Sequence, residues 1–540
     1  MPVPAAGAVA EKPAPQASDS TVDAASDAAQ TQASPAEDVV RFNIWEFVIK
    51  GNTVLPQTEI ERAVYPFLGE GRTVDDVFAA EAALNSLYRQ AGYVTVQVFT
   101  PEQSVDDGVV MLEVLEAKVG LSRVEGARFY DVERVREAVP ALESGEVPEA
   151  RAFQQQVAAL NSRSPDRRVT AEIAPGIREG TVDAKLIVED KLPLHGSFEL
   201  NDRFSRDTTR LRSATNLSYG NLWQKEHTIG MSLLNTPQEL DQTRVISLNY
   251  AAPITQSDTL FGYFVDSSSN VAAFNDTGSV GIIGTGNVYG LRWIHLMPPA
   301  GDVFNSLTFG VDYKDFEDTV AAEADGGIVT PVSYFKGSAS YSALMLTGNP
   351  EVRFSVDANL GFRTGKSIED EFLDKRFKAN ANFAFLTSRL SALYRFDPTH
   401  AVAVRIDGQL TEDALISNEQ LSLGGVDSVR GYLASQVLTD YGFSGSLEYR
   451  LTPNLNAYLK DLDWVGAPQA IAFVDGALGS SYDPLPGVDP AVRLASGGFG
   501  FMSSVRRGLD TAVYLAWPFI DNQEISAGDS RVHFRVGVKF

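Results

Sequence analysis

The feature that most constrains this fold is a regular alternation of apolar and polar residues. Between Glu351 and Phe362 every second residue is apolar, and the residues between them are charged, polar or glycine. The apolar set is Val352, Phe354, Val356, Ala358, Leu360 and Phe362. Successive side chains of a β-strand point to opposite faces of the sheet, so the pattern predicts a strand with one apolar and one polar face.

The same alternation recurs through residues 191–540, where helical periodicity largely disappears. The last apolar set is Val532, Phe534, Val536, Val538 and Phe540. This block is large for a two-sheet sandwich, and at about 22 residues per strand and loop it holds about 16 strands. We therefore predict a closed β-barrel with a polar lumen, although alternation alone does not show which face meets lipid.

Composition argues against several other classes of protein. No run of about 18 apolar residues occurs, which disfavours a helical membrane span. The formal net charge of −25 disfavours nucleic acid as a partner, because phosphate binding needs concentrated Lys and Arg. Cys is absent, so disulfides, thiolate metal sites and Cys nucleophiles are excluded.

The N-terminal 40 residues differ in amino-acid composition from the rest of the chain. They consist mainly of Ala, Pro, Ser, Gln and Asp, and they contain no aromatic residue. Such a segment cannot bury enough apolar surface to offset the entropy lost on ordering, so we predict a disordered acidic tail over residues 1–40. The first four residues lack the basic and apolar regions of a signal peptide, and we expect the sequence to begin near the mature terminus of an exported protein.

A duplicated βααββ module precedes the alternating block. The letters Ala-Leu-Asn-Ser occur at Ala83–Ser86 and again at Ala159–Ser162, an offset of 76 residues. Gly51 and Gly126, each placed after a predicted strand, are 75 residues apart. Two separate features that repeat at nearly the same spacing favour duplication of the module over chance.

The module boundaries follow from this offset. We predict a first module over residues 41–119 and a second over 120–190. The expected elements of the first are strands at 42–49, 93–99 and 109–115 and helices at 56–68 and 74–91. The expected elements of the second include helices at 132–139 and 150–162 and final strands at 169–173 and 181–188.

A glycine-rich loop carries a single arginine at Gly424–Tyr432, which reads Gly-Gly-Val-Asp-Ser-Val-Arg-Gly-Tyr. Arg430 has five fixed donors and no accessible neutral form, so an enclosed position would require a facing carboxylate. The simpler interpretation is a solvated loop arginine. Three other polar stretches are assigned to turns or loops: Asn201–Ser205 as a structural turn, and 270–287 and 314–331 as long extracellular loops.

Together, the two modules, the alternating block, the Val429-Arg430-Gly431-Tyr432 (VRGY) loop and the terminal Phe540 resemble the TpsB transporters of two-partner secretion. These transporters belong to the Omp85 superfamily, and the likeness covers about residues 41–540. It implies an all-β transmembrane barrel of 16 antiparallel strands over 191–540, preceded by two α+β POTRA domains. The loop around 424–437 would fold back into the lumen.

The resemblance also implies specific site residues. In that family the Asp of a Phe-x-Asp-x-Gly strand motif meets the loop arginine. Phe473-Val474-Asp475-Gly476-Ala477 matches at Phe473 and Asp475 but has Ala477 where glycine is expected, which leaves the local backbone open. The implied loop latch joins Arg430 to Asp475, with Glu448 as a second candidate partner, although Asp475 could be an ordinary lumen carboxylate. The C-terminal residues implied to form the barrel-assembly signal are Phe534, Val536, Val538 and Phe540, the alternative being that Phe540 simply ends an edge strand.

The implied function is secretion of one cognate unfolded exoprotein from the periplasm to the surface of a Gram-negative bacterium. The POTRA domains would lie in the periplasm and capture the substrate, and the Arg430 loop would latch or gate the pore. Expected partners are a TpsA-like exoprotein, outer-membrane lipid and, during biogenesis, the barrel assembly machinery. We expect a monomer without cofactor, metal or nucleic acid.

Two alternatives remain open at the level of sequence. The first is an outer-membrane assembly factor of the same superfamily, which usually carries more than two POTRA modules. The second is a passive porin or a barrel enzyme. The five His residues are scattered without metal-binding spacing, and no Gly-x-Ser-x-Gly elbow occurs, so we do not expect an enzyme.

Overall fold

The computed structural model describes residues 40–540 except 106, 207, 274–281, 321–327, 364–368, 454–467, 488, 506–507 and 523–524. The predicted N-terminal tail thus lies outside the described residues, apart from Val40. The chain divides into two compact units, one reaching Glu116 without Gly92–Thr95, and the other containing those four residues and the chain from Ala117 onward. No helix in the described ranges is long and apolar enough to cross a membrane.

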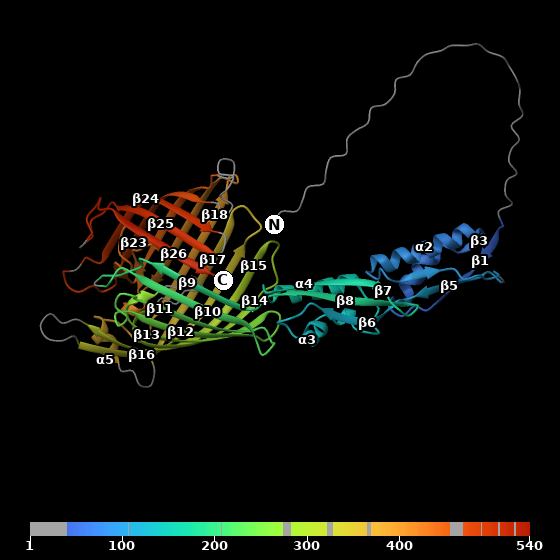
Figure 1. The fold of residues 1–540 in the computed structure, drawn as a ribbon, viewed down its shortest axis with the longest axis horizontal. Helices are drawn as coiled ribbons and strands as arrows, with labels where there is room; N and C mark the ends of the chain where they lie inside the picture. The colour runs from blue at the N-terminus through green and yellow to red at the C-terminus, as the bar shows by residue number, and fades with distance from the viewer. Residues whose placement is uncertain are drawn as a thin grey trace, which may run out of the picture. The chain divides into compact units, whose positions relative to one another are not determined.

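The first module consists of a three-stranded sheet with two α-helices (Figure 1). In the sheet order β2–β5–β4, β2 is parallel and β4 antiparallel to the central strand. A capping box between Thr73 and Asp76 begins the second helix. The elements are β1 (Phe42–Ile44), β2 (Glu46–Lys50), α1 (Gln57–Val64), η1 (Tyr65–Phe67), β3 (Gly69–Arg72), α2 (Val74–Gln90), β4 (Gln97–Phe99) and β5 (Val109–Leu115).

The second module has the same topology. Its sheet order is β6–β8–β7, again with one parallel and one antiparallel neighbour of the central strand. The elements are β6 (Lys118–Glu125), α3 (Val132–Glu137), η2 (Pro140–Leu142), α4 (Ala150–Ser162), β7 (Arg167–Pro175) and β8 (Thr181–Asp190). The predicted pair of βααββ folds is therefore confirmed, while the module boundaries at 119 and 190 stay predictions.

The repeated glycines have the same structural cause. Gly51 and Gly126 have φ angles of +90° and +89°. A Cβ would lie 2.3 Å from the Val114 carbonyl oxygen in the first case and 2.4 Å from that of Val188 in the second. Only glycine combines the positive φ with this close approach to a neighbouring strand.

The repeated Ala-Leu-Asn-Ser also has one cause. The amide side chain of Asn85 exchanges two 2.9 Å hydrogen bonds with the backbone of Val98. That of Asn161 bonds the backbone of Val169 in the same way, at 2.9 and 2.7 Å. In both modules an asparagine on the second α-helix thus fixes the beginning of the following strand.

Some element limits differ from the sequence prediction. The helix expected over 56–68 ends as α1 at Val64 and continues as a 3-10 turn, because Pro66 has no amide hydrogen for the α-helical ladder. The strand expected over 93–99 forms only at Gln97–Phe99. The strand expected over 42–49 is divided into β1 and β2 at Trp45.

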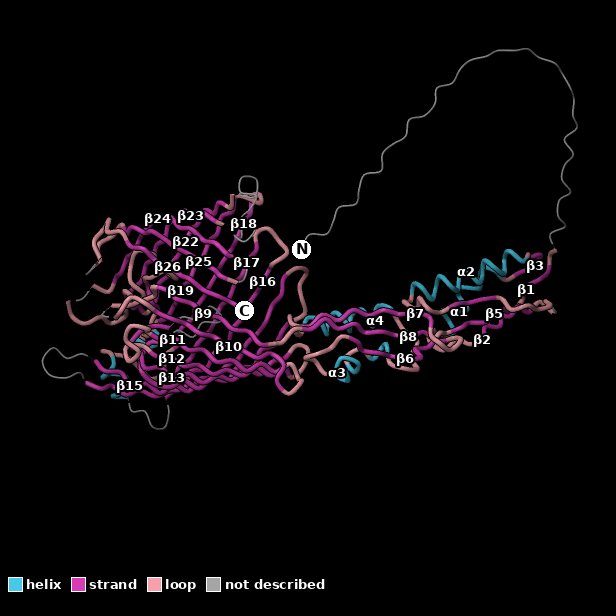
Figure 2. Tube along the Cα trace, in the orientation of Figure 1, coloured by secondary structure: helices cyan, strands magenta, loops and turns pink. Residues whose placement is uncertain are grey.

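In the described part of the second unit, sixteen strands close into an antiparallel barrel in which β26 pairs with β9. Figure 2 shows the strands that make up the barrel wall. The strands are β9 (Leu194–Asn201), β10 (Arg212–Leu222), β11 (His227–Asn235), β12 (Arg244–Pro253), β13 (Asp258–Ala273), β14 (Ile282–Leu296), β15 (Val303–Val320), β16 (Ile328–Met345), β17 (Glu351–Arg363), β18 (Ala384–Arg395), β19 (His400–Thr411), β22 (Tyr441–Leu451), β23 (Gln469–Ser480), β24 (Ala491–Val505), β25 (Leu509–Pro518) and β26 (Arg531–Lys539).

The apolar face of the alternating strands lies on the outside of the barrel. On β17, Phe354, Leu360 and Phe362 are 38, 50 and 48% exposed, whereas Asn359 between them is only 6% exposed. A soluble sandwich would bury the apolar set instead. The tertiary structure therefore shows what alternation could not, namely an apolar outer wall and a polar lumen, as in a membrane barrel.

Strand direction defines two ends of the barrel. The end where β9 begins, directly after β8, is called the near end, and the opposite end the far end. Because neighbouring strands are antiparallel, the connections at 202–211, 236–243, 412–440, 481–490 and 519–530 lie at the far end. So does the connection between β17 and β18, which contains α5 (Glu369–Lys375).

The two segments expected to be long loops are mostly strand. β15 continues to Val320 and β16 begins at Ile328, and the two pair throughout this stretch; β13 likewise reaches Ala273 and β14 begins at Ile282. The loop prediction was wrong because polar residues do not end a strand whose backbone ladder continues. The residues between these strand ends lie outside the described part of the chain.

Candidate functional site in the barrel lumen

The long connection between β19 and β22 turns back into the lumen. It contains η3 (Ser417–Glu419) and a short hairpin of β20 (Leu421–Leu423) and β21 (Val437–Thr439). Residues 424–436 form the tip of this hairpin and are called the Arg430 loop. Val429 and Tyr432 are fully buried in a cluster with Ala477 and Leu494 of the barrel wall.

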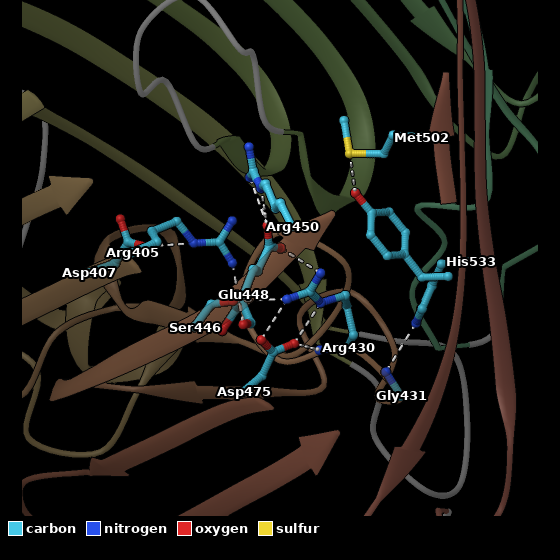
Figure 3. Close-up of polar contacts among 12 residues, drawn as sticks. Arg405, Asp407, Arg430, Gly431, Ser446, Glu448, Arg450, Asp475, Met502 and His533 are labelled. Carbon is cyan, nitrogen blue, oxygen red and sulfur yellow. Dashed lines mark hydrogen bonds and ion pairs between the residues drawn. The ribbon is translucent and has the colours of Figure 1, made fainter. Parts of the chain in front are cut away.

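The loop arginine and its predicted carboxylate are in direct contact (Figure 3). The Nε and Nη2 of Arg430 donate to the two oxygens of Asp475, each at 2.7 Å. The backbone N–H of Arg430 donates to the same carboxylate at 3.0 Å. Both residues are almost completely buried, at 2% and 1% exposure. The arrangement is a bidentate, charge-assisted pair between a loop and strand β23.

The neighbouring strand β22 supplies further partners. Glu448 accepts a 2.7 Å hydrogen bond from the Nη1 of Arg430, and the hydroxyl of Ser446 accepts one of 2.8 Å from Nη2. Glu448 also binds Arg450 at 2.7 Å. The structure therefore brings Arg430 to Glu448 as well as to Asp475. Ser446 was not predicted, because a serine on an alternating strand carries no distinguishing sequence signal.

Two aromatic rings complete the environment of the guanidinium. The carbon Cζ of Arg430 lies 3.6 Å from the centre of the Phe473 ring and 5.1 Å from that of Tyr514. Phe473 and Asp475 are two residues apart on β23 and so share its inner face. The Phe-x-Asp motif thus presents a ring and a carboxylate to the same cation.

Burial and ion pairing have opposite effects on the charge of Arg430. Burial by itself would lower the pKa of Arg430, but hydrogen bonding and charge attraction from Asp475, and then from Glu448, outweigh it and raise the pKa above its ordinary value. The arginine therefore stays charged in the lumen. Removing either partner would leave a buried charge without compensation.

The glycine of the VRGY motif connects the loop to the last strand. Gly431 has a φ of +93°, and its backbone N–H donates to the Nε2 of His533 at 3.0 Å. A backbone N–H can only donate, so Nε2 carries no proton and the Nδ1 proton faces Asp202, 3.0 Å away. Asp202 follows β9 and also accepts from the backbone of Phe534. This chain of contacts joins the loop to both strands of the barrel seam.

The aromatic residue of the motif is anchored by backbone groups. The carbonyls of Ala495 and Ile520 share the single hydroxyl proton of Tyr432, with oxygen–oxygen distances of 3.1 and 2.8 Å. Strand β23 stays regular through Ala477, which pairs with neighbours on both sides. The departure from the Phe-x-Asp-x-Gly pattern therefore leaves the strand intact, and the Ala477 side chain packs with the loop.

The segment assigned to a structural turn has a second role. Arg203 forms an ion pair with Asp427 of the loop, with 3.0 Å between Nη2 and Oδ1 and 2.9 Å between Nε and Oδ2. Asp202, its neighbour, holds His533. The purely structural interpretation of Asn201–Ser205 was incomplete, because 224 residues separate Arg203 from its loop partner and sequence spacing gives no signal for such a contact.

The C-terminal residues lie away from the Arg430 loop. Val532, Val536 and Val538 are exposed on the outer face of β26, and Phe540 is 74% exposed. The backbone of Phe540 pairs with that of Gly196 on β9, where a Cβ would lie 2.1 Å from the Phe540 ring. The proposed barrel-assembly signal of Phe534, Val536, Val538 and Phe540 stays a prediction.

Comparisons with known proteins agree with this architecture. Residues 42–117 match the "POTRA domain, ShlB-type" and residues 180–462, just over half the chain, match "Haemolysin secretion/activation protein ShlB/FhaC/HecB". The chain is 25% identical to the outer membrane transporter CdiB of Escherichia coli over 92% of this chain and 82% of that protein. It is 20% identical to the heme/hemopexin transporter protein HuxB of Haemophilus influenzae, over 88% of this chain and 82% of that protein.

Solved structures show the same fold. CdiB from Escherichia coli superposes with a TM-score of 0.59 at 20% identity, covering 95% of this chain and 93% of that chain. BamA from Haemophilus ducreyi, lacking POTRA domains 1–3, superposes with a TM-score of 0.57 at 14% identity, covering 92% and 100%. Together, the POTRA modules, the closed barrel, the lumen loop and the family match over residues 180–462 show that this chain belongs to the ShlB/FhaC/HecB family of haemolysin secretion/activation proteins.

Proposed function

We propose that this chain is an outer-membrane transporter that secretes one cognate unfolded exoprotein, of the TpsA type, from the periplasm to the cell surface. Family membership, the named transporter relatives and the closed barrel with an apolar outer wall support this function. The POTRA modules lie in the periplasm and the barrel in the outer membrane of a Gram-negative bacterium. Because the periplasm supplies no nucleotide, folding of the substrate outside the cell drives export.

The Arg430 loop is the proposed latch of the pore. The observation that carries this proposal is the buried pairing of Arg430 with Asp475 inside the lumen. Ordering a long loop costs conformational entropy, and a bidentate ion pair at its tip offsets that cost in the resting state. Passage of a polypeptide through the lumen then requires the loop to move or rearrange.

The POTRA modules are the proposed capture sites. In the first module β4 is an edge strand of the sheet, and in the second module β7 is. An edge strand offers unpaired backbone groups to which an extended, unfolded chain can add as a further strand. This mode recognises backbone and suits a substrate that has not yet folded.

The proposal also includes the partners of the barrel and its oligomeric state. Outer-membrane lipid covers the apolar wall, the barrel assembly machinery inserts the chain, and the transporter works as a monomer. We infer transport without catalysis. Within the described residues, no group of three or more His, Asp or Glu side chains is arranged to hold a metal ion.

Surface release of an exoprotein tests the proposed function. A large exported protein encoded beside this gene is produced in a Gram-negative host with and without this chain, and the protein on the cell surface and in the medium is measured. We expect release only with the chain. Equal release without it would contradict secretion, and a loss of many unrelated barrels on depletion would instead indicate an assembly factor.

A further inference from the structure

A second buried polar cluster lies at the far end of the barrel and is centred on Asp440, between β21 and β22. Asp440 has no exposed surface. Its carboxylate accepts from both terminal nitrogens of Arg376, with the Nη2 contact at 2.6 Å. It also accepts from the backbone N–H groups of Leu415 and Tyr482, at 3.1 and 2.7 Å, and from the Gln420 amide at 2.9 Å. Described segments of three far-end connections, those between β17 and β18, β19 and β22, and β23 and β24, therefore meet at one carboxylate.

Arg376 is held from several sides in return. It follows α5 in the connection between β17 and β18. Besides Asp440, its guanidinium donates to the carbonyls of Leu415 and, at 3.0 Å, Tyr482. The ion pair is thus embedded in backbone contacts from the two other connections, so that removing one charge would loosen all three.

The α5 connection and the first part of the connection between β19 and β22 pack against an apolar part of the lumen wall. Residues of the α5 connection and of 412–420 fill the space in front of side chains from β12 to β16, with α5 beside β16 (Figure 1). The filling residues are Phe372, Ala379, Ala381, Phe383, Leu415 and Ile416, and the wall residues are Val245, Val265, Val288, Phe316, Val332 and Tyr334. Phe372 and Leu415 are fully buried.

Glu419 is a second anchor, which contacts Tyr334 of this apolar cluster. It is 6% exposed, and it accepts from the hydroxyl of Tyr334 at 2.6 Å and from Lys336 at 3.3 Å, as well as from Lys314. The amide of Gln409 donates to the carbonyls of both Glu419 and Asp440, at 3.0 and 2.9 Å. One side chain of β19 thus connects the two anchors.

These segments form a cover across the far end of the lumen, because they pack against β12 to β16 on one side and bond to Asp440 and Tyr482, beside β22 and β23, on the other. A cavity of about 540 Å³ lies next to residues 418–420 and 424–428 and is otherwise lined by side chains of strands that include β9, β10 and β15 to β19. A polypeptide moving from this cavity to the far end must displace the covering segments. The wall strands are held by their own backbone ladders, so the cover can leave without opening the barrel.

We propose that residues 370–383 and 412–420 form an exit lid, that Asp440 and Glu419 are its positioning residues, and that secretion requires this lid to unseat in addition to the Arg430 loop. The inference rests on the proposed function and adds to it the control of the pore exit. Its partner is the outgoing polypeptide, which competes with the lid for the apolar lumen wall.

A reversible cross-link tests whether the lid must move. Lys378 of the lid and Asp483 of the connection between β23 and β24 form an exposed ion pair of 2.8 Å. Because the chain contains no Cys, a Lys378→Cys, Asp483→Cys variant has thiols only there. A cleavable bis-methanethiosulfonate reagent joins them, and a reductant releases them. The control variant is Arg395→Cys, Glu351→Cys, an ion pair of 2.5 Å across two strands that already pair at the near end.

Secretion of the exoprotein encoded beside the gene is measured before cross-linking, after cross-linking and after reduction. We expect at least a tenfold loss with the lid cross-link, recovery on reduction, and no loss in the control. Secretion at the uncross-linked rate through cross-linked protein would overturn the lid. Absence of secretion in every state, including the unmodified chain, would contradict the proposed function instead. Measurements of channel conductance then decide whether the lid closes the pore.

Channel conductance in planar bilayers needs no substrate. We expect Asp440→Asn to raise the frequency of open events severalfold, Asp440→Glu to restore part of the closed state, and the lid cross-link to suppress openings. The matched control is Glu226→Gln, which removes the charge from a largely buried 2.7 Å pair with Arg167 at the near end and touches no lid residue. Wild-type conductance in folded Asp440→Asn would overturn the lid. If that variant does not fold, openings that are unchanged by cross-linking of the Lys378→Cys, Asp483→Cys variant would overturn it.

Discussion

Two buried arginine–carboxylate clusters lie on the same connection between β19 and β22, and they are built in opposite ways. In the Arg430 cluster the loop supplies the cation and the strands β22 and β23 supply the carboxylates. In the Asp440 cluster the connection supplies the carboxylate, and the cation comes from another far-end connection. The first cluster joins a loop to the wall, and the second joins loops to one another.

This difference has a mechanical consequence. The strands that carry Asp475 and Glu448 are held by backbone ladders on both sides, so the Arg430 loop is positioned against a rigid support. The backbone of Asp440 is bonded to Gln409 of β19 and to Ser480 of β23, but its ion-pair partner Arg376 lies in a connection and not in a ladder strand. We therefore expect release of Arg430 to move one loop, and release of Asp440 to loosen the lid as a unit.

Arg430→Ala is the substitution with the largest expected effect. It leaves Asp475 buried without the guanidinium, and breaking a buried ion pair costs about 3–5 kcal/mol. We expect secretion to fall at least tenfold and the thermal transition of the folded barrel, followed by its electrophoretic mobility, to shift downward. Arg389→Ala, which removes an exposed lumen arginine paired with Asp407, is the control. Normal secretion with normal folded yield in Arg430→Ala would refute the latch.

Double substitution tests whether the two clusters are independent. Within one cluster, Arg430→Ala and Asp475→Ala should couple by about 0.5–3 kcal/mol, because both remove the same interaction. Across the clusters, Arg430→Ala and Asp440→Asn should add to within about 0.5 kcal/mol. The same thermal transition measures both cycles. Strong coupling across the clusters would mean that loop and lid move as one body.

Glu448→Gln has a smaller expected effect within the Arg430 cluster. The amide oxygen can still accept from Arg430, and Asp475 remains as its bidentate partner, but Glu448 also accepts from Arg450. The loss is therefore that of charge in the contacts with two arginines, about 1.5–3 kcal/mol. We expect a modest downward shift of the thermal transition and secretion above that of Arg430→Ala. An effect as large as that of Arg430→Ala would assign the main role to Glu448 instead of Asp475.

His533→Ala has the smallest expected effect. It removes the acceptor of the Gly431 N–H and the donor to Asp202, worth about 1 kcal/mol for a typical hydrogen bond. His533→Gln should recover part of this loss, because its amide can both accept and donate. The measurement is again the thermal transition. Equal loss in both variants would show that His533 acts through packing rather than through the contact with Gly431.

The fold was largely predictable because it depends on periodic patterns. Alternation set the barrel strands, and the repeated Gly51 and Gly126 revealed the duplicated module, since each glycine satisfies a local backbone requirement. The strand extensions in β15 and β16 were missed. The polar residues there predicted a loop, but the backbone ladder between β15 and β16 continues through them and keeps them in β-strands.

The site was predictable only in part. The glycine-rich loop singled out Arg430, the resemblance supplied Asp475, and a place on the intervening strand suggested Glu448; the structure brings all three together. The sequence gave no signal for the loop contacts of His533 and Arg203, which span 102 and 224 residues. Each of these residues is unremarkable among its sequence neighbours, because what distinguishes it is its position across the lumen.

By itself, the sequence determined the strand and helix patterns, the duplicated module and the presence of one loop arginine that needs a carboxylate. These are local properties, fixed by side-chain periodicity, glycine conformation and the permanent charge of a guanidinium. The tertiary structure alone decided which face of the barrel is apolar, which carboxylates enclose Arg430, and that segments of three connections meet at Asp440. These features arise only on barrel closure, because closure brings residues that are far apart in the chain into one small, water-poor lumen.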